Sequence, residues 1–170
     1  AASDVYKRQI LTFAKGVGNG MAMGGVVARA EIMDSLGANS ISTFGGNPMS
    51  SVGALANLKY ILDHDLQGNS LRMGQRLRDH LQPVVDATPW IAEIRGKGLM
   101  LAIEAIHPDS NQPDAAAAGN LMELTKDDGL LIGKGGLYGN VLRIAPPLTV
   151  TAEEIDEAAD IIVRAIAAIE

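Results

Sequence analysis

One lysine ends an apolar run and is followed by closely spaced glycines. Residues 10–20 read ILTFAKGVGNG, and Lys15 is the only charged residue among them. An amine at the end of a buried strand is placed to lose its proton and attack a carbonyl carbon, while the glycines let a bulky group approach the backbone. Enzymes hold an aldehyde cofactor such as pyridoxal phosphate as a Schiff base on such a lysine. A solvated surface lysine is the alternative, because most lysines are exposed.

A second candidate segment joins a hydroxyl group, two glycines and the start of a helix. Residues 42–48 read STFGGNP, in which Asn47 suits a helix N-cap and Pro48 the first helical position. Free backbone amides, the Thr43 hydroxyl and the positive end of the helix together favour a phosphate. The alternative is an ordinary capped loop in which Thr43 bonds the local backbone.

An arginine interrupts a third apolar segment. Arg143 stands between Leu142 and Ile144, just before a pair of prolines. An arginine within an apolar strand requires an anion, and its planar fork matches a carboxylate in a bidentate way that lysine cannot. A substrate carboxylate and a structural ion pair with a neighbouring acid both satisfy this requirement, and the segment alone does not separate them.

Other segments fall short of nucleotide and metal motifs. Residues 129–134 have three residues between their glycines, and Gly135 follows the lysine where a P-loop requires Ser or Thr. Residues 16–20 lack the spacing of a dinucleotide fingerprint. The three histidines, which have no metal-ligand spacing, are His64, His80 and His107. The sequence therefore predicts no metal site.

The composition narrows the class of protein. The 170 residues are 47% hydrophobic, enough for a buried core, and carry a formal net charge of −6. Nucleic-acid binding, which needs a basic face, is not expected. No apolar run approaches the roughly 20 residues that span a bilayer, and no cysteine is present for a disulfide or a thiolate metal site. We expect a cytoplasmic enzyme with no nucleic-acid or membrane partner.

The apolar pattern predicts an α/β chain whose second half forms an α+β lobe. Strands are expected over residues 10–14 (buried), 25–29, 91–94, 98–106, 130–133 and 141–144. Helices are expected over residues 31–36, from 48, from near 71 to before Pro89, over 115–127, and after a capping box at 151–154. The inward residues expected on the helix near residue 71 are Leu71, Leu77, Leu81, Val84 and Val85.

Four motifs, in this order and spacing, resemble class III pyridoxal-phosphate aminotransferases. They are LTFAKGVGNG at 11–20, STFGGNP at 42–48, RGKGLM at 95–100 and LRIAPPL at 142–148. The resemblance covers residues 10–170. Residues 129–140, GLLIGKGGLYGN, are most similar to the branch that contains alanine–glyoxylate aminotransferase 2.

The resemblance implies a fold-type I pyridoxal-phosphate transferase, of which this chain holds a part. Residues 10–48 would be the C-terminal edge of the large cofactor domain. Residues 49–88 would be linking helices, and 89–170 the small α+β C-terminal domain. Residues 1–9 are polar, join abruptly to an apolar strand and resemble a non-native scar, which is set aside from the fold.

The same resemblance implies roles for individual residues. Lys15 matches the Schiff-base lysine, which then moves a proton between substrate carbon and cofactor. Thr43, flanked by Ser42 and Phe44, matches the threonine that reaches the cofactor phosphate of the partner subunit in a homodimer with a shared site. Arg143 matches the arginine that binds the substrate α-carboxylate. The final matched position is Gly98, in a turn lining the substrate entrance.

The resemblance also implies a reaction, with alternatives. We expect transfer of an amino group from alanine or an ω-amino acid to a keto acid such as pyruvate or glyoxylate, with pyridoxal 5'-phosphate as cofactor. The family's aspartate on the pyridine nitrogen, its stacking aromatic and its main phosphate loop match nothing in this chain, so the chain alone is expected to be inactive. An aminomutase or phosphoamine lyase of the same family, and a non-catalytic interaction domain, are the alternatives.

Overall fold

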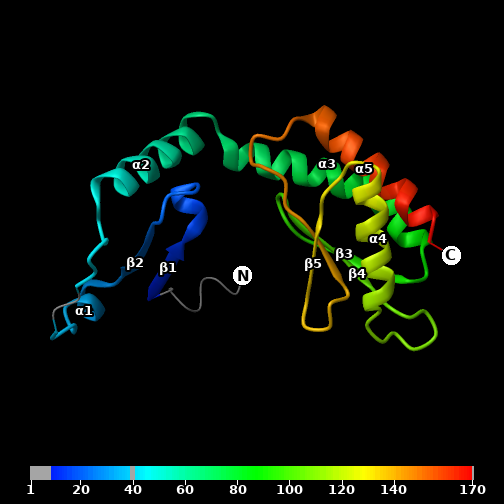
Figure 1. Ribbon diagram of the computed structural model, residues 1–170, viewed down its shortest axis with the longest axis horizontal. Helices are drawn as coiled ribbons and strands as arrows, with labels where there is room; N and C mark the ends of the chain where they lie inside the picture. The colour runs from blue at the N-terminus through cyan, green and yellow to red at the C-terminus, as the bar shows by residue number, and fades with distance from the viewer. Residues whose placement is uncertain (1–8, 39–40, 170) are drawn as a thin grey trace. The chain divides into compact units, whose positions relative to one another are not determined.

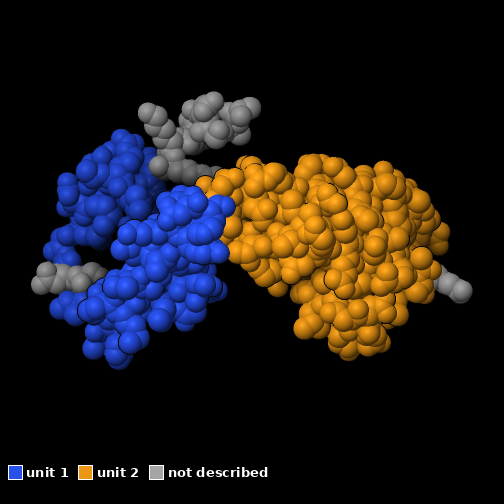
Figure 2. All heavy atoms as spheres, turned by 90° about the horizontal axis from the view of Figure 1, so that it is seen from above, with its two compact units in different colours: residues 1–64 blue, residues 65–170 orange. Residues whose placement is uncertain are grey.

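Two groups of elements make up the computed structural model, which describes residues 9–38 and 41–169. Unit 1 is Ala1–His64 and unit 2 is Asp65–Glu170, and each is described by itself (Figure 2). Apart from Gln9, the expected non-native segment 1–9 lies outside the described residues. The unit boundary falls inside the segment 49–88, whose role as linking helices stays a prediction.

Unit 1 is built on a two-stranded antiparallel ladder (Figure 1). Strand β1 (Ile10–Ala14) continues directly into the 3₁₀ turn η1 (Lys15–Gly18), and β2 (Gly24–Ala28) returns alongside β1. The short helix α1 (Ala30–Met33) follows, and then α2 (Pro48–Asp63), which packs against η1. The ladder and α2 therefore carry the Lys15 turn between them.

The expectation that residues 10–14 form a buried strand is wrong on burial, although the strand itself is confirmed. Every residue of β1 is exposed, with Ile10 at 53% and Leu11 at 51%. A two-stranded ladder buries a face only beneath another layer. The described residues of unit 1 place no such layer over β1, so its apolar side chains meet solvent.

Unit 2 is a four-stranded antiparallel sheet with helices on one face. The sheet order is β3-β4-β6-β5. Helices α3 and α4 pack on the sheet, and α5 packs against both of them (Figure 1). The elements of unit 2 are α3 (Leu66–Ala87), β3 (Ile91–Lys97), β4 (Met100–Ala105), α4 (Ala115–Asp127), β5 (Gly133–Gly135), β6 (Val141–Ile144) and α5 (Ala152–Ala167). This arrangement confirms the expected α+β lobe.

The core of unit 2 lies between the sheet and its helices. Strand β4 shows the reason, because its side chains alternate: Leu101, Ile103 and Ala105 are buried, while Ala102 and Glu104 face the other side. The largest fully buried apolar side chains are Leu77, Leu81, Ile103, Leu121, Leu142, Ile155 and Ile162. One face of the sheet is thus closed by packing, and the opposite face stays open.

Helix starts follow the capping residues seen in the sequence. Thr151 and Glu154 form the expected capping box at α5, with each side chain bonded to the other residue's backbone N–H. The Asn47 side chain accepts a hydrogen bond from the Ser50 N–H at 3.0 Å, and Pro48 occupies the first turn of α2. These local expectations are confirmed because capping depends only on neighbouring residues.

Two expectations in unit 2 are wrong. Leu71 is 56% exposed rather than inward, because six residues before Leu77 places it roughly 120° around the helix from that buried position. The strand expected at 130–133 is observed at Gly133–Gly135. Its ladder pairs with Val141–Ile144 from Gly133 onward, so register, which local apolar runs do not encode, sets its position.

Candidate active site

Lys15 stands at a backbone reversal. It leaves β1 with a left-handed φ of 57°, and its N–H donates to the Met23 carbonyl at 3.2 Å. Left-handed backbone is unfavourable for a residue with a Cβ and persists only where surrounding contacts hold it. Its side chain is exposed and forms no ion pair with any residue in the described ranges. The ammonium group is therefore exposed and unpaired among these residues.

The segment 42–44 forms a turn just before α2. Gly45 N–H donates to the Ser42 carbonyl at 3.1 Å, and the Asn47 side chain donates to the Phe44 carbonyl at 3.0 Å. Ser42 and Thr43 are exposed, and Phe44 is 82% exposed. Within the described part of the chain, the Thr43 hydroxyl has no hydrogen-bond partner. The loop thus presents a hydroxyl close in sequence to a helix N-terminus, a combination that suits a phosphate.

Arg143 lies on the open face of the unit 2 sheet. The ladder aligns it with Ala102 on β4 and with Gly133 on β5, and Arg95 on β3 completes the same row. Arg143 is exposed, and over residues 9–38 and 41–169 it forms no ion pair. The structural ion pair weighed from the sequence is therefore not formed among these residues, and the guanidinium remains available to an external anion.

The Arg143 side chain lies beside two glycines of β5, Gly133 and Gly135. A Cβ placed on Gly135 would lie 3.2 Å from Arg143 Nε and 3.4 Å from Cδ, and one on Gly133 would lie 3.7 Å from Nη2. The intervening Lys134 points elsewhere, with Nζ 3.4 Å from the Ala115 carbonyl. Two glycines facing one arginine let its side chain lie low over the strand. This feature was missed in the sequence analysis, which compared Gly133 and Gly135 only with a P-loop pattern.

We expect Gly135→Ala to displace the Arg143 side chain. The new methyl group crowds Nε, so kcat/KM for a carboxylate-bearing substrate should fall about tenfold in a full-length protein carrying these residues. Gly119→Ala is the matched control, because its Cβ would meet only Lys134 Nζ at 3.5 Å. Neither glycine has a positive φ, so backbone strain does not enter. Equal kinetics for the two variants would contradict the role of Gly135.

The second arginine of the row is already neutralised. Arg95 Nη1 bonds Glu93 Oε1 at 2.7 Å and also bonds Glu104 Oε2. The hydrogen bond from Arg95 holds the pKa of the Glu104 carboxyl below its ordinary value, against the opposing effect of burial. The buried Asn140 amide adds a hydrogen bond to the same carboxylate at 3.2 Å. Of the two guanidinium groups in this row, Arg143 is the one left for a ligand.

The lowered pKa of Glu104 predicts an acid dependence of stability. A group whose folded pKa is depressed stabilises the fold above its unfolded pKa, and this contribution is lost as pH falls through the folded pKa. The free energy of unfolding of the parent chain should therefore fall when the pH is lowered from about 7 to about 4. In Glu104→Gln, which has no carboxylate to protonate at this position, we expect a smaller fall. Urea denaturation of the 170-residue chain at both pH values measures this. Asp109→Asn, an exposed change of equal charge, should leave the loss unchanged.

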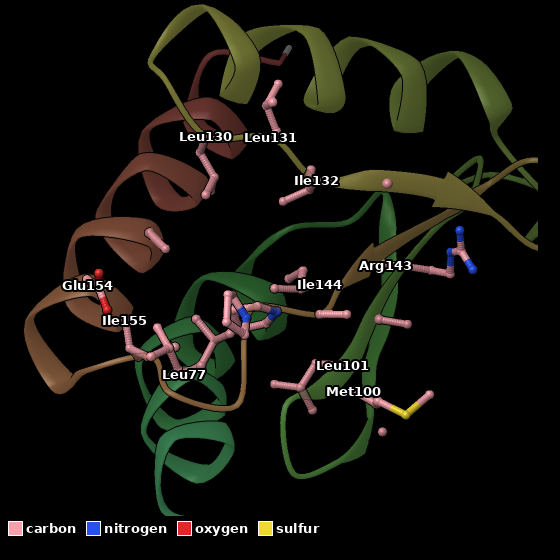
Figure 3. Close-up of a pocket in the computed structure, with 18 of the residues that line it drawn as sticks. Leu77, Met100, Leu101, Leu130, Leu131, Ile132, Arg143, Ile144, Glu154 and Ile155 are labelled. Carbon is pink, nitrogen blue, oxygen red and sulfur yellow. The ribbon is translucent and has the colours of Figure 1, made fainter. Parts of the chain in front are cut away.

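An apolar hollow of about 980 Å³ extends from this row in unit 2. Its walls come from β4, from residues 130–132, and from the N-terminal part of α5 (Figure 3). Figure 3 shows Arg143 at one end and Glu154 at the other, with Leu101 and Ile144 between them. The hollow therefore offers apolar surface beside an unpaired cation, as expected of a site for a small carboxylate.

Gly98 lies in the turn between β3 and β4. Its φ is 54°, and its carbonyl lies against α3, where a Cβ on Gly74 would come within 2.1 Å of that oxygen. The Leu99 N–H after it donates to Ser70 Oγ at 3.1 Å. Gly98 does not line the hollow, whereas Gly96 and Met100 do. The positive φ and the close packing of the turn on α3 explain a glycine at position 98 without any role in substrate binding. The expected place of Gly98 at a substrate entrance stays a prediction.

The described residues contain neither a group of side chains suited to a metal ion nor a membrane-spanning helix. No group of three or more His, Cys, Asp or Glu side chains is arranged there to hold a metal ion. In the same residues, no helix is both long and apolar enough to cross a bilayer.

The candidate residues fall into both units. Lys15 and the 42–44 turn belong to unit 1, and Arg143 and Gly98 belong to unit 2. Taken one at a time, an exposed amine suits a carbonyl, a hydroxyl by a helix start suits a phosphate, and an unpaired guanidinium suits a carboxylate. Comparison with known proteins gives the family.

The chain belongs to the class III aminotransferase family. The family profile described as "Aminotransferase class-III" matches residues 4–166. An alanine/serine racemase of Pyrococcus horikoshii is 36% identical over 160 residues, covering 94% of this chain and 34% of the relative. The mitochondrial alanine–glyoxylate aminotransferase 2 homolog 2 of Arabidopsis thaliana is 40% identical over 149 residues, covering 86% of this chain and 31% of the relative.

A solved structure confirms the fold. A phospholyase from Arthrobacter, in complex with phosphoethanolamine, superposes with a TM-score of 0.91 at 31% identity. The match covers 98% of this chain and 41% of that one. The chain thus spans about a third of the length of the curated relatives it matches. The α/β fold expected from the family resemblance is confirmed.

Proposed function

We propose that this chain is the lysine- and arginine-bearing part of a pyridoxal-phosphate-dependent aminotransferase. The enzyme moves an amino group from an amino acid, such as alanine or an ω-amino acid, to a keto acid such as pyruvate or glyoxylate. The observation that carries the proposal is the free Lys15 amine held at a left-handed turn, in a chain that belongs to class III. We further propose a cytoplasmic homodimer with a shared site.

The described residues fit pyridoxal 5'-phosphate in their chemistry. Lys15 supplies an exposed amine for its aldehyde, and the Thr43 hydroxyl suits its phosphate, flanked by Ser42 and Phe44. Cofactor phosphates favour such a hydroxyl together with backbone amides at a helix start. When bound, this cofactor withdraws electrons from the substrate carbon that loses its proton. The residues present therefore match what the group requires.

The roles proposed for the protein groups follow from their ionic character. Lys15 would hold the aldehyde of the cofactor and would act as the general base and acid that moves a proton at the substrate carbon. Arg143 binds the substrate carboxylate through two parallel N–H···O hydrogen bonds. The hollow beside Arg143 offers apolar walls to the rest of the substrate. For Gly98, which does not line the hollow, a place in the turn at the substrate entrance is proposed only from the family resemblance.

Borohydride trapping tests the cofactor assignment. A full-length protein carrying these residues is incubated with pyridoxal phosphate and reduced, and the modified peptide is identified by mass spectrometry. We expect the label on Lys15. Label spread over exposed lysines such as Lys59, with none on Lys15, would overturn the proposal.

A donor screen tests the reaction. Candidate amino acids are supplied with pyruvate or glyoxylate, and the new amino acid is measured. Two relatives define the competing outcomes, because one is named a racemase and the neighbour of known structure is named a phospholyase. Ammonia released from a phosphorylated amine without a keto acid would indicate a lyase. Interconversion of alanine enantiomers without a keto acid would indicate a racemase.

We expect the 170-residue chain by itself to be inactive. Its residues supply the amine and the arginine, whereas the aspartate and aromatic expected from the family resemblance match nothing in this sequence. Incubation of the purified chain with pyridoxal phosphate should therefore give no visible absorption that is lost in Lys15→Ala. Appearance of such absorption would contradict the expectation at the loading step.

A further inference from the structure

We infer that Asn57 is a positioning residue for Lys15. The Asn57 side-chain amide donates to the carbonyls of Gly16 and Val17, at 3.3 and 3.1 Å. These are the two residues that follow Lys15 in η1, and Asn57 lies about forty residues further along the chain on α2. The inference rests on the function proposed for Lys15, and it adds the group that holds the backbone of that lysine in place.

The 3₁₀ turn η1 requires stabilising contacts from outside the turn. Lys15 has a φ of 57° and Asn19, at the other end of η1, has a φ of 45°. The left-handed region is costly for Lys15, and less so for Asn19, because asparagine adopts it more readily than other side-chain-bearing residues. Inside the turn, Asn19 N–H donates to the Gly16 carbonyl at 3.2 Å. Lys15 begins the 3₁₀ turn and Asn19 follows its end. The backbone hydrogen bonds within a single 3₁₀ turn stabilise this conformation only weakly.

Helix α2 supplies the hold from one face. A Cβ on Gly53 would lie 3.0 Å from Met21 Cγ, so the missing side chain lets the loop after η1 approach the helix. Asn57 follows Gly53 by four residues, and residues four apart share a helix face. The 16-residue α2 thus contacts the loop at Gly53 and bonds the turn at Asn57. Groups held by regular helices are positioned more precisely than groups on loops alone.

The chemistry of the contact requires an amide nitrogen. Both partners of Asn57 are carbonyl oxygens, which only accept, so the NH₂ group must face them. Aspartate has the same shape but no donor when ionised, and it would bring negative charge against two carbonyl oxygens. Asn57→Asp therefore separates hydrogen bonding from packing, since a packing role alone would tolerate this replacement.

Amide hydrogen exchange of the 170-residue chain tests the hold directly. We expect the Lys15 and Asn19 amides to exchange about tenfold faster in Asn57→Ala, and faster still in Asn57→Asp. Asn57→Gln, which keeps the donor, should lie closer to the parent chain. Amides of the β1–β2 ladder report whether unit 1 of each variant is folded, and Asn120→Asp on α4 is the matched control. Unchanged exchange at Lys15 and Asn19 in a folded Asn57→Asp would overturn the inference.

A second measurement connects the hold to the cofactor. In a full-length protein carrying these residues, we expect the affinity for pyridoxal phosphate to fall about tenfold in Asn57→Ala and about 100-fold in Asn57→Asp. We also expect a shifted pH midpoint of its visible absorption. Equal affinity and midpoint in all variants would overturn the inference while leaving the proposed function intact. Failure of the unmodified protein to label Lys15 would overturn the proposed function, whereas amide exchange would still decide whether Asn57 holds the turn.

Discussion

Replacing Lys15 by alanine is expected to lower the rate of amino transfer about 10⁴-fold in a full-length protein carrying these residues. The variant loses both the amine that bonds the cofactor aldehyde and the group that moves the proton. Single-turnover kinetics with the best donor from the screen measure the loss. Because the cofactor can still bind through its phosphate, added methylamine should restore part of the rate by supplying an amine.

Lys59→Ala is the control for this replacement. Lys59 is another exposed lysine of unit 1, and it lies on α2. Its removal changes the net charge by the same amount and should leave the rate unchanged. A Lys15→Ala variant that turns over like the Lys59→Ala variant would show that the chemistry belongs to another group.

Replacing Arg143 by leucine is expected to lower kcat/KM for carboxylate-bearing donors about 100-fold, equivalent to about 2.7 kcal/mol. A bidentate ionic contact beside apolar walls is lost, and the carboxylate is left without its partner. Arg143→Lys should recover only a minor part, because an ammonium group cannot reproduce the planar fork. Steady-state kinetics over a series of donors measure both variants.

The donor series contains the internal control. A primary amine without a carboxylate has nothing for Arg143 to bind, so its kcat/KM should be nearly equal in the parent and in Arg143→Leu. Arg164→Leu is the external control, because Arg164 is exposed and pairs with Asp128 at 3.2 Å, away from the hollow. Equal losses for amines and amino acids would show that Arg143 supports the fold rather than the substrate.

Local signals in the sequence predicted much of the architecture. The capping box of α5, the Asn47–Pro48 start of α2 and the end of α3 before Pro89 were all expected from neighbouring residues. The strand over residues 141–144 was also expected from its own apolar pattern. The motifs around Lys15 and Arg143 identified the family, which the profile match confirms. The roles of those two residues stay predictions that the experiments above decide.

The tertiary structure decided which side chains meet. Asn57 reaches the turn after Lys15 from about forty residues away, and no spacing in the sequence indicates this contact. Gly133 lies beside Arg143 because of the register between β5 and β6. Local apolar patterns do not encode this register, and for that reason the strand was wrongly expected at residues 130–133.

Contacts between distant segments also decide which of the two arginines is paired with a carboxylate. Arg95 and Arg143 both lie beside apolar residues in the sequence, yet Arg95 is neutralised by Glu93 and Glu104. Arg143 has no such partner among the described residues. The sequence by itself determined the elements, their caps and the family, because these depend on short segments. Which arginine remains free, and which amide holds the lysine turn, depend on contacts between distant segments, which only the folded chain brings together.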